Sequence, residues 1–399
     1  MDFLANVWSY TGPFLLVLTV LVFVHELGHY LVARKNGVRV EVFSIGFGPE
    51  IFGWNDTHGT RWKISWVPLG GYVKFFGDAG VASRPDAEHV AAGADELPDG
   101  ENEDRLTLEQ EGRLTPEQQA ESYHFKTVGQ RSMISAAGPV ANFIFAILLL
   151  AGLYSFVGQP FTPAVVGGIN PDSPAERAGF QIGDQVVKID DSTIERFEDM
   201  QQIVRLSLGE PMVVIIIRDG QETVLSVSPE VTEYKDRLGN IQRIGLLGIT
   251  RSGVEYIRHG PFDAIVSATK ETFTITEMTL KAVGQMIIGA RTAEDLGGPI
   301  QIAKMSGQMA EQGVVAIIWF MAVLSINLGL INLFPVPMLD GGHLLFYFFE
   351  AVRGRPLSEK VQEYGFRIGI SMILMLMLFA TWNDLSKLPV FDFFTKLLS

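Results

Sequence analysis

The sequence predicts a polytopic α-helical membrane protein with four transmembrane helices, a membrane-associated β-hairpin or sheet, and one extracytoplasmic α+β domain. Three observations predict this fold class. Hydrophobic residues make up 47% of the 399 residues and charged residues only 19%, and the mean hydropathy is positive. The apolar residues gather in separate runs, which is typical of membrane spans. Between these runs lie segments with the alternating pattern of strands.

Four apolar runs are long enough, or nearly so, to cross about 30 Å of hydrocarbon as helices. The second run is rich in small residues, which let neighbouring helices approach closely, and Pro139 is tolerated there if other helices satisfy the freed carbonyl. The fourth run is the shortest. We expect the spans near residues 13–33, 133–157, 314–334 and 368–382.

Lysine and arginine residues flank these runs unevenly. Arg34, Lys35 and Arg39 follow the first span and others lie between the third and fourth, whereas the residues before the first span carry none. Cytoplasmic loops are rich in lysine and arginine. We therefore expect the loops after the first and third spans to be cytoplasmic, with both termini on the outer side.

The region between the first two spans has two parts. Residues 39–77 alternate apolar and polar positions, as in RWKISWVPLGGYVKFF, which predicts a β-hairpin or small sheet at the cytoplasmic face of the membrane. The pattern fits a purely structural subdomain as well as a functional one. Residues 78–125 should form a flexible cytoplasmic loop, because residues 78–122 hold 13 acidic and 3 basic residues and few bulky apolar ones.

The region between the second and third spans also has two parts. Residues 161–250 contain strand-like runs, such as MVVIIIR, separated by turn signals, which predicts an independent domain with a sheet edge that could bind a peptide. Residues 251–312 are interrupted by charges, which favours amphipathic helices on the membrane surface. The complete division is 1–38, 39–77, 78–125, 126–160, 161–250, 251–312, 313–343 and 344–399, the last comprising a cytoplasmic loop, the fourth span and a tail.

Charge and cysteine content exclude some functions. The formal net charge of −14 argues against a nucleic-acid partner, which would require a basic face. The sequence has no cysteine, so it offers neither a disulfide nor a thiol as nucleophile or metal ligand.

The first span contains ionisable residues in the motif HELGH. On a helix, His25 and His29 project from the same face and can bind one Zn²⁺, while Glu26 lies beside them to act as a general base on water. The alternative is a pair of structural histidines, which would need polar partners that are not evident in this run. Ionisable groups are costly in a membrane, which favours the metal site.

A third ligand is expected at the end of the third span, in NLFPVPMLDGGH. Spans one and three run in the same direction, so Asp340 should lie near the two histidines, toward the cytoplasmic half of the membrane. A catalytic zinc site uses three protein ligands and keeps one position for water. Asn332 lies before Asp340 and either contacts the substrate backbone or an oxyanion, or serves as a helix-packing amide.

The sequence resembles the site-2 protease family of intramembrane zinc metalloproteases, in particular its bacterial, RseP-like members. HELGH and NLFPVPMLDGG are similar to the two motifs of that family, and FSIGFGP, VPLGGYVKFFGD, FKTVGQRSMISAAGPVANFIFAI and GGPIQIAK are similar to other stretches of those proteins. The resemblance covers most of the chain apart from the acidic loop. It implies that residues 161–250 form a periplasmic PDZ domain, single where many close relatives have two.

The resemblance also implies the roles of individual residues. His25, His29 and Asp340 would bind zinc, with Glu26 as general base. Substrate contacts would come from a groove near the end of the third span and from the strand region that engages an extended peptide. These expected substrate-binding residues are Asn332, Pro335, Pro337, Gly70, Gly71, Tyr72 and Val73.

The function that follows is hydrolysis of transmembrane segments of single-span proteins, such as anti-sigma factors, in regulated intramembrane proteolysis. The enzyme would lie in the bacterial inner membrane with both termini periplasmic and the active site toward the cytoplasm. Two alternatives remain. A non-catalytic scaffold would bind partners through the PDZ-like domain, and a metal transporter would bind zinc in transit, although its ionisable residues would then be expected on both sides of the membrane.

Overall fold

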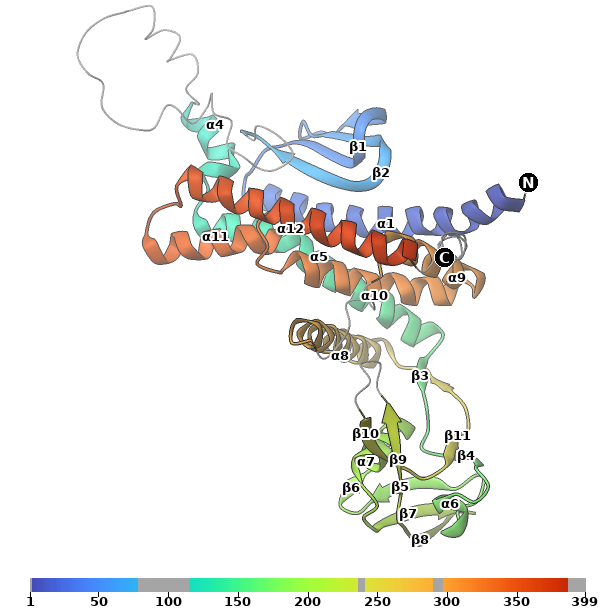
Figure 1. Ribbon diagram of the computed structural model, residues 1–399. Helices are drawn as coiled ribbons and strands as arrows, with labels where there is room; N and C mark the ends of the chain where they lie inside the picture. The colour runs from blue at the N-terminus through green and yellow to red at the C-terminus, as the bar shows by residue number, and fades with distance from the viewer. Residues whose placement is uncertain (1, 78–114, 236–240, 290–296, 387–399) are drawn as a thin grey trace, which may run out of the picture. The chain divides into compact units, whose positions relative to one another are not determined.

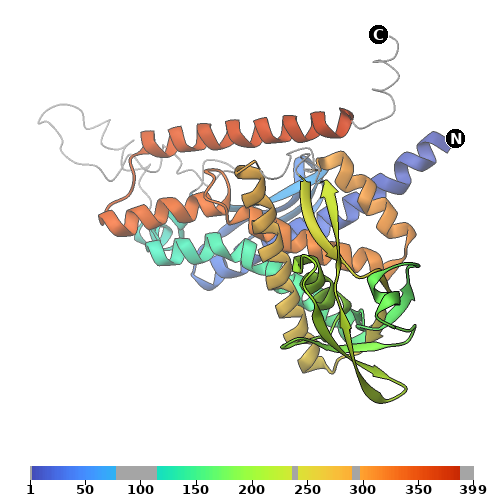
Figure 2. The same cartoon turned by 60° about the horizontal axis from the view of Figure 1, so that its bottom comes forward.

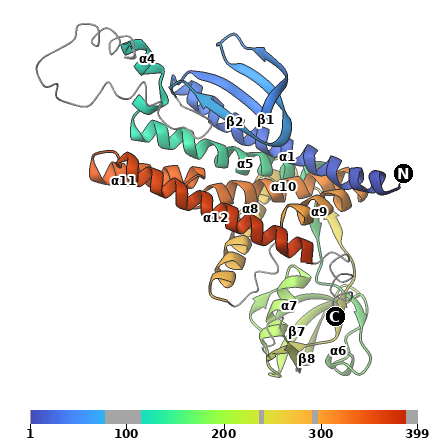
Figure 3. The same ribbon diagram turned by 45° about the horizontal axis from the view of Figure 1, so that its top comes forward.

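The computed structural model describes residues 2–77, 115–235, 241–289 and 297–386 (Figure 1). The chain divides into two compact units. The first unit comprises Met1–Leu150, Thr269–Thr279 and Leu296–Ser399, and the second comprises Ala151–Ala268 and Leu280–Asp295. The first unit is mainly helical and carries one small sheet, and the second contains most of the strands (Figures 1 and 3).

Four helices among the described residues are long and apolar enough to cross a membrane, as the sequence predicts. Three of the four extend beyond their apolar runs, because flanking polar residues also favour helix and continue it into polar surroundings, whereas the third ends at Asn332, within its run. The fourth shows this most clearly, since a predicted 15-residue core lies inside a candidate span of 26 residues. The four helices are α1 (Asp2–Lys35), α5 (Val128–Phe156), α10 (Val314–Asn332) and α12 (Glu359–Ser386).

Small residues set the contacts between these helices. Gly28 of α1 packs directly on α5, where a Cβ at this position would lie 2.7 Å from the Cβ of Ala141. Gly329 of α10 also packs on α5, where a Cβ would lie 3.0 Å from the carbonyl oxygen of Pro139. Such close backbone approach is the usual way in which helices associate in membranes, and it brings α5 into contact with both neighbours.

The sheet of the first unit lies against α1 (Figure 3). It consists of β1 (Val40–Asn55) and β2 (Arg61–Phe75), which pair in two registers: Ile45 pairs with Gly71 on one side and with Ile64 on the other. The 40–45 segment of β1 is therefore central. The 71–75 segment of β2 forms an edge that pairs with no other strand in the described part of the chain.

A half-buried carboxylate fixes the far turn of this sheet. Asp56 accepts hydrogen bonds from the Tyr30 hydroxyl of α1 (2.9 Å) and from Nε1 of Trp62 (3.0 Å), as well as from two backbone amides of its own turn. Phe52 and Trp66 on the same sheet are 61% and 68% exposed, which suits contact with a membrane interface. The sheet is thus held on the helix that carries the HELGH motif.

Shorter elements complete the first unit. Of the predicted acidic loop, residues 78–114 lie outside the described part of the chain. Its end is helical, because Thr115 and Gln118 form a capping box at the start of a short helix. These elements are α4 (Pro116–Glu121), the 3-10 turn η1 (Tyr123–Phe125), α9 (Pro299–Glu311) and α11 (Asp340–Arg353). Helix α8 (Pro261–Ile287) is amphipathic, does not qualify as a candidate span and belongs partly to each unit.

The strands of the second unit are drawn in green to yellow in Figure 2. Four of them form an antiparallel sheet in the order β6-β5-β7-β8. The apolar core of the unit includes Val186, Ile189 and Ile216, and the buried carboxylate of Asp184 pairs with the half-buried Arg218. The unit extends past the predicted end at residue 250, because β12 pairs with β3. Its helices are α6 (Pro174–Arg177) and α7 (Phe197–Leu206), and its strands are β3 (Gln159–Phe161), β4 (Val166–Ile169), β5 (Gln185–Ile189), β6 (Ser192–Thr193), β7 (Met212–Arg218), β8 (Gln221–Val227), β9 (Glu230–Lys235), β10 (Ile241–Leu246), β11 (Ile249–Arg251) and β12 (Glu255–Ile257).

Candidate metal centre

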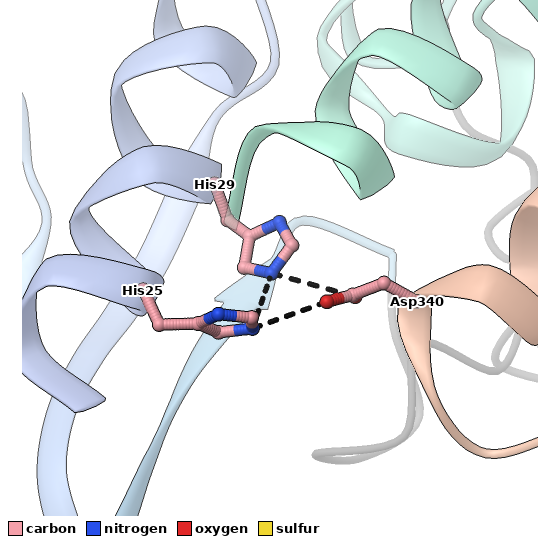
Figure 4. Close-up of side chains that lie close together, drawn as sticks. All are labelled: His25, His29 and Asp340. Atoms are coloured by element: carbon pink, nitrogen blue, oxygen red, sulfur yellow. Dashed lines mark hydrogen bonds and ion pairs between the residues drawn. The ribbon is translucent and has the colours of Figure 1, made fainter. Parts of the chain in front are cut away.

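Helix α1 presents two imidazoles on one face, one helical turn apart (Figure 4). The Nε2 atoms of His25 and His29 lie 3.3 Å apart, and the rings meet edge to face. Both side chains are nearly buried, with 11% and 12% of their surface exposed. The i, i+4 spacing therefore produces the shared face that the sequence predicts.

Asp340 reaches the same point from the first residue of α11 (Figure 4). Its Oδ2 lies 3.1 Å from Nε2 of His25, and its Oδ1 lies 3.4 Å from Nε2 of His29. Asp340 follows a turn in which Met338 has a φ of +101°, a strained value for a residue other than glycine. The turn after Pro337 thus directs the carboxylate toward α1.

The donor set and its spacing fit a divalent metal. Zn²⁺ binds imidazole nitrogen and carboxylate oxygen at about 2.0–2.2 Å in a tetrahedron, whose edge is then about 3.4 Å. The three ligand separations, 3.1, 3.3 and 3.4 Å, are close to that edge. The Oδ2 atom of Asp340 is buried and accepts no hydrogen bond, as expected of an oxygen reserved for a cation.

Helix α5 contacts the outer nitrogens of both imidazoles. Nδ1 of His29 donates to the carbonyl oxygen of Ile134 (2.8 Å). Nε2 of that ring is then unprotonated, and its lone pair faces His25 and Asp340. The side-chain amide of Asn142 lies 3.1 Å from Nδ1 of His25. A Cβ at Gly138, between these two positions, would clash with Nε2 of His29 and lie 2.8 Å from Nε2 of His25.

A pocket of about 330 Å³ opens at this centre. Of the expected catalytic and substrate-binding residues, Glu26, Asn332, Gly71, Tyr72 and Val73 line it. The Glu26 carboxylate accepts a hydrogen bond from the backbone amide of Val73. The edge segment of β2 and the expected general base are therefore in direct contact.

The other three expected substrate-binding residues do not line the pocket. Gly70, with a φ of +147°, packs against the ring of Phe47. Pro335 is exposed, and Pro337 lies against α12, where a Cβ at Gly365 would be 3.7 Å from its ring. The two prolines break the chain between α10 and α11, so their contribution is to the direction of the turn.

Several further residues line the pocket. His343, at the end of NLFPVPMLDGGH, follows Asp340 by one helical turn and contacts the ring of Phe366. Tyr123 and Ser135 share a hydrogen bond (3.2 Å), and Phe366 of α12 closes one side. The sequence does not link them to the site because they lie far from HELGH along the chain. The available signal is that each is polar or aromatic and close to a predicted span.

Comparison with known proteins identifies the chain. Residues 13–376 match Peptidase family M50. The chain belongs to this family. It is 43% identical over 384 residues to a protein of Agrobacterium fabrum named a zinc metalloprotease, covering 95% of the chain and 96% of that protein. It is also 38% identical over 394 residues to Metalloprotease MmpA of Caulobacter vibrioides, covering 95% and 96% of the two chains.

Membership of family M50 makes the protein a zinc metalloprotease, and its four apolar helices give it a membrane location. Two solved structures resemble about a quarter of the chain. They are PDZ domains of SdrC-like proteins from Listeria monocytogenes and Listeria innocua, with 16% and 18% identity and TM-scores of 0.18 and 0.19. They cover 23% and 24% of this chain, and the chain covers 88% and 98% of theirs.

Proposed function

We propose that this M50 metalloprotease cleaves peptide bonds of membrane-spanning segments at the centre formed by α1 and α11. The observation that carries the proposal is the convergence of His25, His29 and Asp340, with Glu26, in one pocket beside a candidate span. A catalytic zinc site needs three such ligands, an adjacent base and room for water and substrate. The described residues include a candidate for each of these roles.

The proposed zinc ligands are His25, His29 and Asp340. Bound zinc would act as a Lewis acid toward the scissile carbonyl and would lower the pKa of a water molecule. Glu26 then accepts a proton from water and delivers it to the departing amine. Asn332 is half-buried in the pocket wall and would donate to the substrate backbone or to the developing oxyanion.

The edge of β2 provides a way to hold the substrate. A helical substrate keeps its carbonyls in internal hydrogen bonds, so the segment must unwind before it can be cleaved. An extended chain paired with Gly71–Val73 would regain backbone hydrogen bonds at the pocket. Backbone groups point alternately to the two sides of a strand, so Gly71 should face the pocket as Val73 does. Gly70, Pro335 and Pro337 would shape the groove from outside.

The proposed substrates are single-span membrane proteins, with anti-sigma factors as the model. The proposed location is the bacterial inner membrane, with both termini and a PDZ-like domain at residues 161–250 in the periplasm and the metal centre toward the cytoplasm. The distribution of lysine and arginine around the spans supports this orientation.

The decisive experiment compares the wild-type protein with Glu26→Gln, purified in detergent, on a tagged single-span substrate. We expect Glu26→Gln to lose at least 100-fold in cleavage rate while retaining zinc, because the base is removed and the ligands remain. Glu41→Gln is the control: this carboxylate pairs with Lys74 (2.9 Å) on the sheet, away from the lining of the pocket, and should cleave normally.

Other outcomes distinguish the alternatives. Equal cleavage by wild type and Glu26→Gln would show that Glu26 is not the general base. Zinc in both with cleavage by neither would leave the metal site standing and reopen the choice of substrate or the transporter. Absence of zinc from correctly folded wild type would refute the metal site and leave the scaffold.

A further inference from the structure

Asn142 is a fully buried polar residue within the α5 span, and neither the family assignment nor the proposed mechanism gives it a role. Burying an amide in a membrane-spanning helix is costly unless it is hydrogen-bonded. The amide nitrogen lies 3.1 Å from Nδ1 of His25, whereas the amide oxygen is buried without a hydrogen bond. This unpaired oxygen suggests what the residue does.

The neighbouring imidazole of His25 lacks a hydrogen-bond acceptor for its ring proton. Nε2 of His25 faces Asp340 and His29. To bind a metal, this nitrogen must carry a free lone pair, so the ring proton must lie on Nδ1. An Nδ1–H group requires an acceptor. The two ends of an amide exchange places by rotation about one bond, and the end that faces the ring is assigned from such pairing.

We propose that Asn142 is a positioning residue for the zinc centre, with its amide oxygen accepting the Nδ1–H of His25. This arrangement satisfies the orphaned oxygen and fixes the tautomer in which Nε2 of His25 can bind metal. Helix α5 would then hold both histidines in the same way, since the Ile134 carbonyl already accepts from Nδ1 of His29.

The backbone at Asn142 is itself anchored. The hydroxyl of Ser325, on α10, donates to the carbonyl oxygen of Asn142 (2.8 Å), and Ser325 is fully buried. The Ser325 side chain therefore contacts the same residue without being part of the lining of the metal pocket. This makes Ser325→Ala a matched control for the loss of a buried hydrogen bond at this position.

The test measures zinc affinity by competition with a chromogenic chelator, on the full-length protein in detergent. We expect Asn142→Leu, which is similar in size and suits a membrane helix, to bind zinc about 10- to 100-fold more weakly than wild type. Asn142→Asp, which keeps an acceptor oxygen, should bind at least as tightly as wild type. Ser325→Ala should stay within about twofold of wild type, since the imidazole keeps its partner.

Cobalt substitution adds a readout that a purely structural role would not change. The visible spectrum of the Co²⁺ form should differ from wild type in Asn142→Leu and return to it in Asn142→Asp. Equal affinity of wild type and Asn142→Leu, or equal weakening by Leu and Asp, would overturn the proposal. The inference rests on the proposed zinc ligands, and the two can fail separately: a wild-type protein whose zinc affinity is unaffected by His25→Ala would refute the ligands themselves.

Discussion

At the scale of single residues, the metal centre depends on a position without a side chain. Gly138 leaves the space into which both imidazoles project, and a Cβ there would clash with His29 and lie 2.8 Å from Nε2 of His25. Real Cβ atoms do not approach so closely, so one ring would have to turn away. At the proposed metal centre, the glycine would thus contribute to metal binding although it offers no ligand.

Gly138→Ala is therefore expected to weaken zinc binding at least 10-fold, because displacement of either ring disrupts the ligand set. Gly152→Ala is the control, since a Cβ at that position of α5 meets nothing within 4 Å and alanine favours helix by about 1 kcal/mol. Zinc content after dialysis at a fixed free zinc concentration checks both. Full zinc occupancy in Gly138→Ala would contradict the steric argument.

The sequence predicts the three proposed ligands but not the residues around them. His25 and His29 stand out because their spacing has a direct geometric meaning, and Asp340 because it is an acidic residue shortly after the third span, which runs in the same direction as the first. Gly138 and Asn142 acquire their meaning only from the contact between α1 and α5, which the sequence does not specify. A polar residue inside an apolar run was the available signal for Asn142.

At the scale of secondary structure elements, the site depends on how closely β2 packs on α1. A Cβ at Gly71 would lie 2.7 Å from the carbonyl oxygen of Ser44, 2.9 Å from Val22 and 3.2 Å from Cγ of Glu26. Glycine at this position therefore lets the strand edge approach the base. The alternating pattern predicts the two strands, but not their double register, because that register depends on irregularities that the pattern does not encode.

Gly71→Ala should reduce substrate cleavage at least 10-fold with zinc content unchanged, because the strand moves away from Glu26 while the ligands stay in place. Lys74→Ala, on the same strand, should cleave normally, since its half-exposed ion pair with Glu41 contributes less than about 1 kcal/mol. Cleavage rate and zinc content measured on the same samples check the prediction. Loss of zinc from Gly71→Ala would show that the strand supports the ligands instead.

At the scale of the whole molecule, the two units have separate cores and separate sources of stability. In the second unit, the Asp184 carboxylate is fully buried and accepts two hydrogen bonds of 2.7 Å from Arg218. Burial alone would raise the pKa of Asp184, but the hydrogen bonds and charge of Arg218 outweigh it and hold the pKa below its usual value. Four spans and the family follow from the sequence, whereas this long-range pair does not.

The ion pair makes the second unit sensitive to acid. A lowered pKa in the folded state adds stability above the ordinary carboxyl pKa of about 3.9, and this stability is lost as the pH falls through the folded-state value. Arg218→Ala should destabilise the second unit at neutral pH, because it leaves the buried Asp184 carboxylate without its cationic partner. Hydrogen exchange of β5 and β7 should report this loss. Zinc content of the first unit should not change, and a change would show that the two units are coupled.

The location of the β2 edge has a consequence for which chains the enzyme can accept. An unpaired strand edge on an open surface tends to recruit other edges and to cause aggregation. Here the 71–75 segment lies beside α1, with Gly71, Tyr72 and Val73 in the lining of the pocket. An α-helix is about 10 Å across with its side chains, much wider than the roughly 4.8 Å spacing of paired strands. If substrates pair with this edge as proposed, the enclosure acts as a test of conformation, because an intact helix has no free backbone groups to offer this edge and an extended chain does.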